Sequence, residues 1–371
     1  MKIRAGYEIA YDCPQPTPMI LALSTHPSRG PDLLTPDRIR IDPVVHATEY
    51  RDGFGNICHV IRAPAGRTTI SSDLLVEDSG EPDPVNWQAE QHSLETLPVD
   101  TLVYLLGSRY CETDRLTALA WARFGKVAKG WPLVQAICDY VNDRITFGYQ
   151  HASPTKTAWD AHSERRGVCR DFAHLAITLC RCMNVPARYC TGYLGDMGTL
   201  PPYAPGDFAA WFEAFLGGRW YTFDPRNNVP RIGRILMARG RDATDVAMVT
   251  SFGPCTLAGF KVITHEEVAA PAAAMSAQSA FRNINRYIAE LAPVAFEPSD
   301  QQFRFASVTC AQFDQIEGLF PHALADFGRE CIENLKFAAR QIILVKLRDL
   351  LEQPAPPLII KVLRGKSLVP L

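Results

Sequence analysis

A cysteine stands at the start of a helical pattern in the segment GVCRDFAHL, residues 167–175. Apolar residues recur after Cys169 at helical spacing, as at Phe172 and Leu175, so the helix is predicted to begin at the cysteine. The first backbone N–H groups of a helix have no partner within the helix and favour an anion. The position therefore predicts a thiol with a lowered pKa, which is the property of a cysteine nucleophile.

A carboxylate follows a predicted hairpin further along the chain. Two strand-like runs flank the turn Gly217-Gly218, and Asp224 comes directly after the second run. An aspartate before a proline is also a common turn residue, so Asp224 has both a catalytic and a turn interpretation. Asp207, at the start of the hairpin, could hydrogen-bond near the thiol or be a turn residue at the strand start, and the turn is the safer interpretation. The hairpin's aromatic residues are predicted to form its core face.

These segments, with PARYCTGYLGD at residues 186–196, resemble the transglutaminase-like superfamily, specifically its bacterial members with an N-terminal β-domain. The resemblance covers residues 1 to about 268. It implies a papain-type fold in which Cys169 is the nucleophile and Asp224 orients a histidine base. The family's His-Ala-Trp triplet stands here as Ala209-Ala210-Trp211. Because alanine cannot accept a proton, the base is missing at residue 209.

Three histidines elsewhere in the sequence are candidates for that base. His151 lies in the predicted loop before the cysteine's helix and is the first choice, with a plain loop histidine as the alternative. His162 is predicted to lie on a short helix with solvent as its partner. His174 is five residues after Cys169, which is about 140° around an ideal helix. We therefore expect His174 to point away from the thiol and to pack inside the domain.

The first 80 residues have the pattern of an antiparallel β-sandwich. Apolar and charged residues alternate over residues 2–11, as in a half-buried strand. Further strand-like runs occur at 19–24, 38–41, 57–62 and 68–76. A polar, proline-containing segment at 81–95 is predicted to be a linker.

Residues 96–268 predict a second, α+β domain. Helical patterns at 131–145 and 169–183 precede strand-like runs, so a nucleophile helix packed on an antiparallel sheet is expected. The strand-like runs are at 187–193, 209–216 and 220–223. An alanine-rich segment predicts a linker over 269–280, and residues 281–371 are predicted to be mainly helical with no assigned chemistry.

The composition of the chain limits which kinds of partner and which cellular location are expected. The 371-residue chain has a formal net charge of −2, which argues against a nucleic-acid partner. No apolar run reaches the length of a membrane span and the N-terminus lacks a signal-peptide pattern, so we expect a cytoplasmic protein without a membrane partner. The 11 cysteines are irregularly spaced, which favours reduced thiols and no structural metal.

Two arginine- or glycine-containing segments have weaker interpretations. The glycines of residues 192–196 lack the lysine of a phosphate-binding loop, so no nucleotide cofactor is expected. The basic stretch at residues 230–242 could hold an acidic partner or could be a solvated strand edge or loop.

Two functions remain open from the sequence. The resemblance implies a cysteine enzyme that acts on amide bonds of a protein or peptide through a thioester, most simply a peptidase or amidase. The replacement at Ala209 motivates the alternative, a catalytically impaired transglutaminase-fold binding or assembly module.

Overall fold

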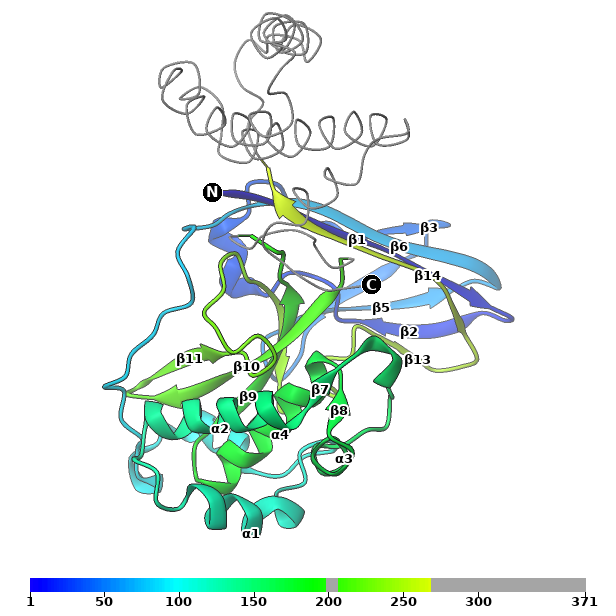
Figure 1. The fold of residues 1–371 in the computed structure, drawn as a ribbon. Helices are drawn as coiled ribbons and strands as arrows, with labels where there is room; N and C mark the ends of the chain where they lie inside the picture. The colour runs from blue at the N-terminus through cyan, green and yellow to red at the C-terminus, as the bar shows by residue number, and fades with distance from the viewer. Residues whose placement is uncertain (198–205, 268–371) are drawn as a thin grey trace, which may run out of the picture. The chain divides into compact units, whose positions relative to one another are not determined.

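Two four-stranded antiparallel sheets share a core in the N-terminal part of the computed structural model, which describes residues 1–197 and 206–267 (Figure 1). The strand orders are β14-β1-β6-β3 and β13-β2-β5-β4, and the predicted sandwich is confirmed. The strands are β1 (Lys2–Cys13), β2 (Thr17–Leu21), β3 (Arg40–Asp42), β4 (Ala47–Arg51), β5 (Ile57–Ala63), β6 (Gly66–Glu77), β13 (Val249–Ser251) and β14 (Thr256–Glu266).

Strand β1 shows why this part of the chain forms a sandwich. Ile3, Tyr7 and Ile9 are buried, whereas the intervening Arg4 and Glu8 are exposed. This alternation places one face of the strand against the second sheet, as the sequence pattern predicts.

Both sheets of the sandwich also contain a strand from the far end of the described chain. Strand β14 pairs with β1, with Ile3 opposite Glu266, and β13 pairs with β2, with Leu21 opposite Val249. Residues 249–266 had been assigned to the second domain in the sequence analysis. The N-terminal sandwich is therefore completed by segments that are distant in sequence.

The second part of the fold is an antiparallel sheet, with strand order β11-β10-β9-β12, packed against helices. This arrangement confirms the predicted α+β class. The elements are α1 (Thr113–Phe124), α2 (Trp131–Arg144), α3 (Ala158–Glu164), α4 (Cys169–Cys182), β9 (Ala187–Tyr193), β10 (Phe208–Leu216), β11 (Arg219–Phe223) and β12 (Ile235–Gly240), with a short parallel pair β7 (Thr146–Phe147) and β8 (Arg166–Gly167).

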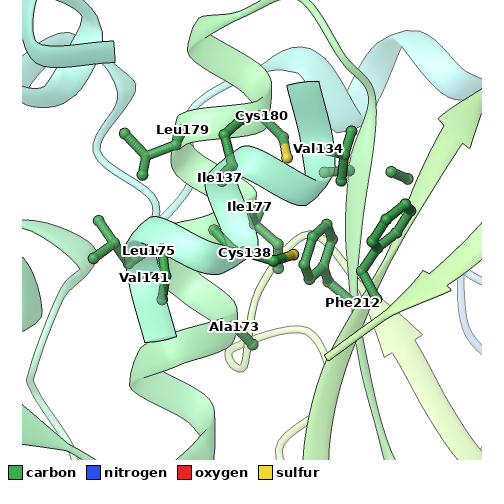
Figure 2. Packing of buried hydrophobic residues seen from close by; sticks show 14 of the residues in the cluster. Val134, Ile137, Cys138, Val141, Ala173, Leu175, Ile177, Leu179, Cys180 and Phe212 are labelled. Atoms are coloured by element: carbon green, nitrogen blue, oxygen red, sulfur yellow. The ribbon is translucent and has the colours of Figure 1, made fainter. Parts of the chain in front are cut away.

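Helix α4 is the centre of this part. Every residue of α4 from Asp171 to Cys182 is buried. Figure 2 shows its apolar side chains, among them Ile177, between those of α2 and Phe212 of β10. Helix α4 is therefore fixed on both sides, which also fixes the position of its first residue.

The two parts share apolar contacts as well as chain connections. The rings of Tyr7 on β1 and Phe208 on β10 have centroids 5.9 Å apart. Residues of β9, β10 and β12 lie in the same apolar cluster as β1 and β6. The start of β10 is thus held by the sandwich as well as by its own sheet.

Short 3-10 helices and extended segments connect these elements. The 3-10 helices are η1 (Pro27–Asp32), η2 (Leu94–Thr96), η3 (Val99–Leu105) and η4 (Tyr149–His151). Most of the predicted linker at 81–95 lies outside helices and strands, between β6 and η2. In residues 1–197 and 206–267, no helix is long and apolar enough to cross a membrane.

Chain contacts divide the molecule after residue 268. The predicted linker at 269–280 and the predicted helical segment at 281–371 lie outside the described residues.

Candidate active site

Cys169 is the first residue of α4, as predicted, and local contacts hold it there. The carboxylate of Asp171 accepts a hydrogen bond from the Val168 backbone N–H at 2.9 Å, which caps the start of the helix. Gly167 makes room for this carboxylate, since a Cβ atom at residue 167 would lie 2.7 Å from the Asp171 Cβ. The segment GVCRD therefore places the thiol at the helix start by sterics and capping together.

The thiol of Cys169 differs from the sequence-based prediction in its acidity. Cys169 is half-buried, and burial raises its pKa to about 11. The Ala210 backbone and the positive charge of Arg226 oppose this rise, whereas the negative charges of Asp207 and Asp224 add to it. Burial of the thiol therefore shifts the pKa in the direction opposite to the lowered value that the sequence predicts.

Ala209 stands on β10, where the resemblance expects the base. Its side chain packs against a small cluster of Cys190, Trp211 and Leu236. The next residue, Ala210, belongs to the larger core cluster with α4, and its backbone hydrogen-bonds the Cys169 thiol. The methyl group at residue 209 therefore lies beside the residue that contacts the sulfur, and it supplies no proton acceptor.

Asp224 follows β11, as predicted, and is almost completely buried. Its Oδ1 accepts hydrogen bonds from the backbone N–H groups of Arg226, at 3.2 Å, and Asn227, at 3.0 Å. Its Oδ2 accepts from Asn227 Nδ2 at 2.7 Å and from Arg234 Nη2 at 2.8 Å. A carboxylate accepts about four hydrogen bonds. The acceptor sites of Asp224 are therefore filled by Arg226 and Asn227, which follow it in the chain, and by Arg234, which directly precedes β12.

Arg234 was not singled out by the sequence analysis as a site residue. Its Nε donates to Asp83 at 2.8 Å while Nη2 binds Asp224, and its guanidinium lies 5.0 Å from the Trp211 ring centroid. The arginine-rich stretch was expected to bind an acidic partner or to be a solvated edge or loop. Arg234 is instead buried in an internal ion pair, and the strand that follows it pairs with β9.

His151 lies in η4, before α3 and α4. Its Nε2 is 3.4 Å from Gln150 Nε2, and its backbone carbonyl accepts from Lys156 Nζ at 3.2 Å. Among the contacts of the described residues, His151 is not one of the groups that perturb the Cys169 thiol. Its role as a base stays a prediction.

The other two histidines have partners away from the thiol. His162 Nε2 lies 2.8 Å from the Tyr140 hydroxyl, so its partner is a side chain, and the expectation of solvent was wrong. His174 is fully buried and stacks on Tyr110 with ring centroids 5.0 Å apart. Its Nε2 accepts the Ala243 backbone N–H at 3.1 Å. The predicted packing of His174 inside the domain is confirmed.

Arg226 and Tyr149 also lie near the thiol, and the sequence analysis did not identify them. The Arg226 guanidinium lies 4.1 Å from the ring centroid of Phe147 on β7, and its charge lowers the pKa of Cys169. Burial raises the pKa of Tyr149, and Cys169 and Asp207 add to that rise. The position of Arg226 two residues after Asp224 was a usable signal, because the resemblance places Asp224 in the site.

The described residues contain no group of three or more His, Cys, Asp or Glu side chains that could hold a metal ion. The groups that lie around Cys169 are the carboxylates of Asp207 and Asp224, the guanidinium of Arg226 and the Ala210 backbone.

Comparisons with known proteins agree with this arrangement. The profile of the transglutaminase-like superfamily matches residues 125–225, which include Cys169, Ala209 and Asp224. An uncharacterized protein of Mycobacterium tuberculosis, Rv2569c, is 31% identical over 240 residues, covering 56% of this chain and 73% of the relative. The uncharacterized protein ML0607 of Mycobacterium leprae is 29% identical over 219 residues, covering 57% and 77%.

A solved structure shows the same fold. The crystal structure of a protein from Cytophaga hutchinsonii, named "Putative Cysteine Protease", matches with a TM-score of 0.62 and 30% identity, covering 71% of this chain and 90% of that one. With the helix-start cysteine, the antiparallel sheet and the profile match, the chain belongs to the transglutaminase-like superfamily.

Proposed function

We propose that this protein is a catalytically impaired transglutaminase-fold module that binds an amide-bearing segment of a protein or peptide at Cys169. The observation that carries the proposal is Ala209, which stands where the superfamily pattern has its base. Without an imidazole, neither removal of the thiol proton nor protonation of a leaving amine has a donor or acceptor at this position.

Two further features support an impaired site. Burial raises the pKa of Cys169 to about 11, so the thiol is protonated at neutral pH. Asp224, the orienting acid in the resemblance, has its oxygens engaged by Asn227, Arg226 and Arg234. Two features that could contact a bound amide remain. The half-buried sulfur lies at the N-terminus of α4, and the Ala210 backbone lies beside it.

A second candidate is a cysteine peptidase or amidase, and the position of Cys169 favours it. In that reaction the sulfur attacks the amide carbonyl carbon, the C–N bond breaks, and the amine leaves with a proton. Water or another amine then attacks the thioester and releases the thiol. His151 is the base proposed for this route, and the thiol proton would have to reach it.

The same proposal covers partners and location. We propose a cytoplasmic location and a protein or peptide partner. A net charge of −2 gives the protein no strong electrostatic attraction to nucleic acid or to an anionic membrane surface.

Steady-state hydrolysis of a library of short peptide amides tests the two candidates against each other. The wild-type chain is expected to show no release of amine above the Cys169→Ala control. Ala209→His is expected to gain hydrolysis that disappears in the Ala209→His/Cys169→Ala double variant. Hydrolysis by the wild type that is lost in Cys169→Ala would overturn the impaired module, and further loss in His151→Ala would support the enzyme.

A further inference from the structure

A second pair of thiols lies in the N-terminal sandwich, away from the Cys169 site. The sulfur atoms of Cys13 and Cys255 are 2.9 Å apart. Both thiols are free, and at this separation either one can donate a hydrogen bond to the other sulfur, so a small movement would bring the pair to bonding distance. The proposed function makes no use of either residue.

The strand register explains why the two cysteines meet. Strand β1 ends at Cys13, and β14 begins at Thr256, which pairs with Asp12. Continuing this antiparallel register by one residue sets Cys255 opposite Cys13. Directly opposed residues of antiparallel strands have Cα atoms about 4.5–5.5 Å apart, which is within the range that a disulfide spans.

The backbone on either side leaves room for the bond. Cys255 precedes the first residue of β14 and follows Pro254, so its backbone lies outside the strand ladder. On the other neighbouring strand, Gly66 of β6 is opposite Cys13 and has no side chain to compete for the space. Small adjustments of residue 255 can therefore close the gap without breaking the sheet.

The two thiols differ in exposure, and this sets the order of reaction. Cys13 is 2% exposed, whereas Cys255 is half-buried. Burial, followed by the contact with Cys255, raises the pKa of Cys13 to about 11. An oxidant in solution therefore reaches Cys255 first, and Cys13 is positioned to resolve the product.

We propose that Cys13 and Cys255 form a redox modification site that a low-molecular-weight disulfide converts into an intramolecular disulfide. With oxidised glutathione, the Cys255 thiolate attacks one sulfur and releases a first glutathione thiolate, which leaves a mixed disulfide. Cys13 loses its proton and attacks the Cys255 sulfur, which releases the second glutathione. The protein dithiol is oxidised by two electrons, and oxidised glutathione is reduced to two glutathione molecules.

The bond would link two distant parts of the chain. Residue 13 lies at the end of the first strand, and residue 255 precedes the last described strand. Strand β14 is an edge strand whose side chains are largely exposed, so its attachment depends chiefly on its pairing with β1. A disulfide at this end would hold β14 in place and raise the resistance of the sandwich to unfolding.

Peptide mapping of the full chain after incubation with oxidised glutathione tests the proposal. Free thiols are blocked with iodoacetamide before digestion without reductant. The wild type is expected to yield a linked Cys13–Cys255 peptide, a loss of two hydrogen masses, and a higher urea midpoint that dithiothreitol reverses. The buried Cys138 and Cys180 serve as internal controls and are expected to stay reduced.

Single variants test the proposed order of reaction, in which Cys255 reacts first and Cys13 then attacks the mixed disulfide. Cys13→Ser is expected to keep one glutathione on Cys255, because the resolving thiol is missing, and Cys255→Ser is expected to stay unmodified at Cys13. A wild-type chain that keeps glutathione on Cys255, or in which both thiols remain open to iodoacetamide after oxidation, would overturn the proposal.

Discussion

Arg234 and Asp224 form a buried ion pair, with Nη2 of the arginine 2.8 Å from Oδ2 of the aspartate and with side chains 7% and 3% exposed. The same guanidinium binds Asp83 from the segment before η2. The acid that the superfamily pattern assigns to the catalytic histidine is therefore tied to a structural arginine. Arg234 therefore joins Asp224, in the loop after β11, to Asp83, in the segment that connects the two parts of the fold.

Removal of Arg234 is expected to be costly. Arg234→Met leaves two carboxylates, Asp83 and Asp224, without their cation in a buried environment, and we expect the free energy of unfolding to fall by about 3–5 kcal/mol. Chemical denaturation measures the change. Arg67→Met is the matched control, since its pair with Asp12 is 62% and 49% exposed and is screened by solvent, so its loss should change the stability far less. Equal losses in the two variants would contradict the structural role given to Arg234.

Gly167 is predicted to be required for the start of α4. In Gly167→Ala, the new Cβ would lie 2.5 Å from Asp171 Oδ2, so the capping carboxylate has to move. We expect a loss of about 1–3 kcal/mol in the free energy of unfolding, from overpacking and the disturbed cap. Gly30→Ala is the control, because a Cβ at that glycine meets no atom within 4 Å. An undisturbed stability in Gly167→Ala would show that the helix start does not depend on this approach.

His174 is expected to make the fold sensitive to acid. Burial holds its pKa below the usual value, and its Nε2 must stay unprotonated to accept the Ala243 N–H. The unfolded chain therefore binds the proton more tightly, so stability is complete above about pH 6.5 and is lost as the pH falls toward the folded-state pKa.

The expected size of this effect is up to about 1.4 kcal/mol per pH unit within that window. Urea unfolding between pH 7 and pH 4 measures it. His174→Gln keeps an acceptor but does not titrate, so its stability should fall less steeply with acid than that of the wild type. Parallel curves for the two proteins would rule out His174 as the source.

The helix and the central strands of the site could be predicted because their patterns are strong and local. Cys169 begins α4 and Tyr193 ends β9, both at the predicted residues. The apolar residues in these segments are the buried ones, so their spacing indicates the element. Helix α4 is covered on both sides, and β9 is buried along its whole length.

Other elements gave no such pattern. Every residue of β4 (Ala47–Arg51) is exposed, so its sequence carries no alternation to detect. Strand β12 ends in Ala-Arg-Gly and follows Arg234, whose charge is neutralised by carboxylates that are distant in sequence. The pairing of β14 with β1 joins residues more than about 240 positions apart, and local periodicity does not encode partners at that separation.

The acidity of Cys169 shows the same limit. A helix N-terminus can be recognised from a few residues, and it predicts a lowered pKa. The desolvation that raises the pKa instead comes from burial of the thiol, which exists only after distant segments of the chain have folded around it.

The pH dependence of Cys169 alkylation tests the central claim, that this site contains no activating base. Iodoacetamide is added to the full wild-type chain between pH 6 and pH 10, and the Cys169 peptide is quantified by mass spectrometry. We predict that the rate rises throughout this range without a plateau, and that at pH 7 it stays below the rate for the same residue in the urea-unfolded chain. Rapid labelling with a plateau at or below pH 7 would show an activated thiolate and would contradict the account.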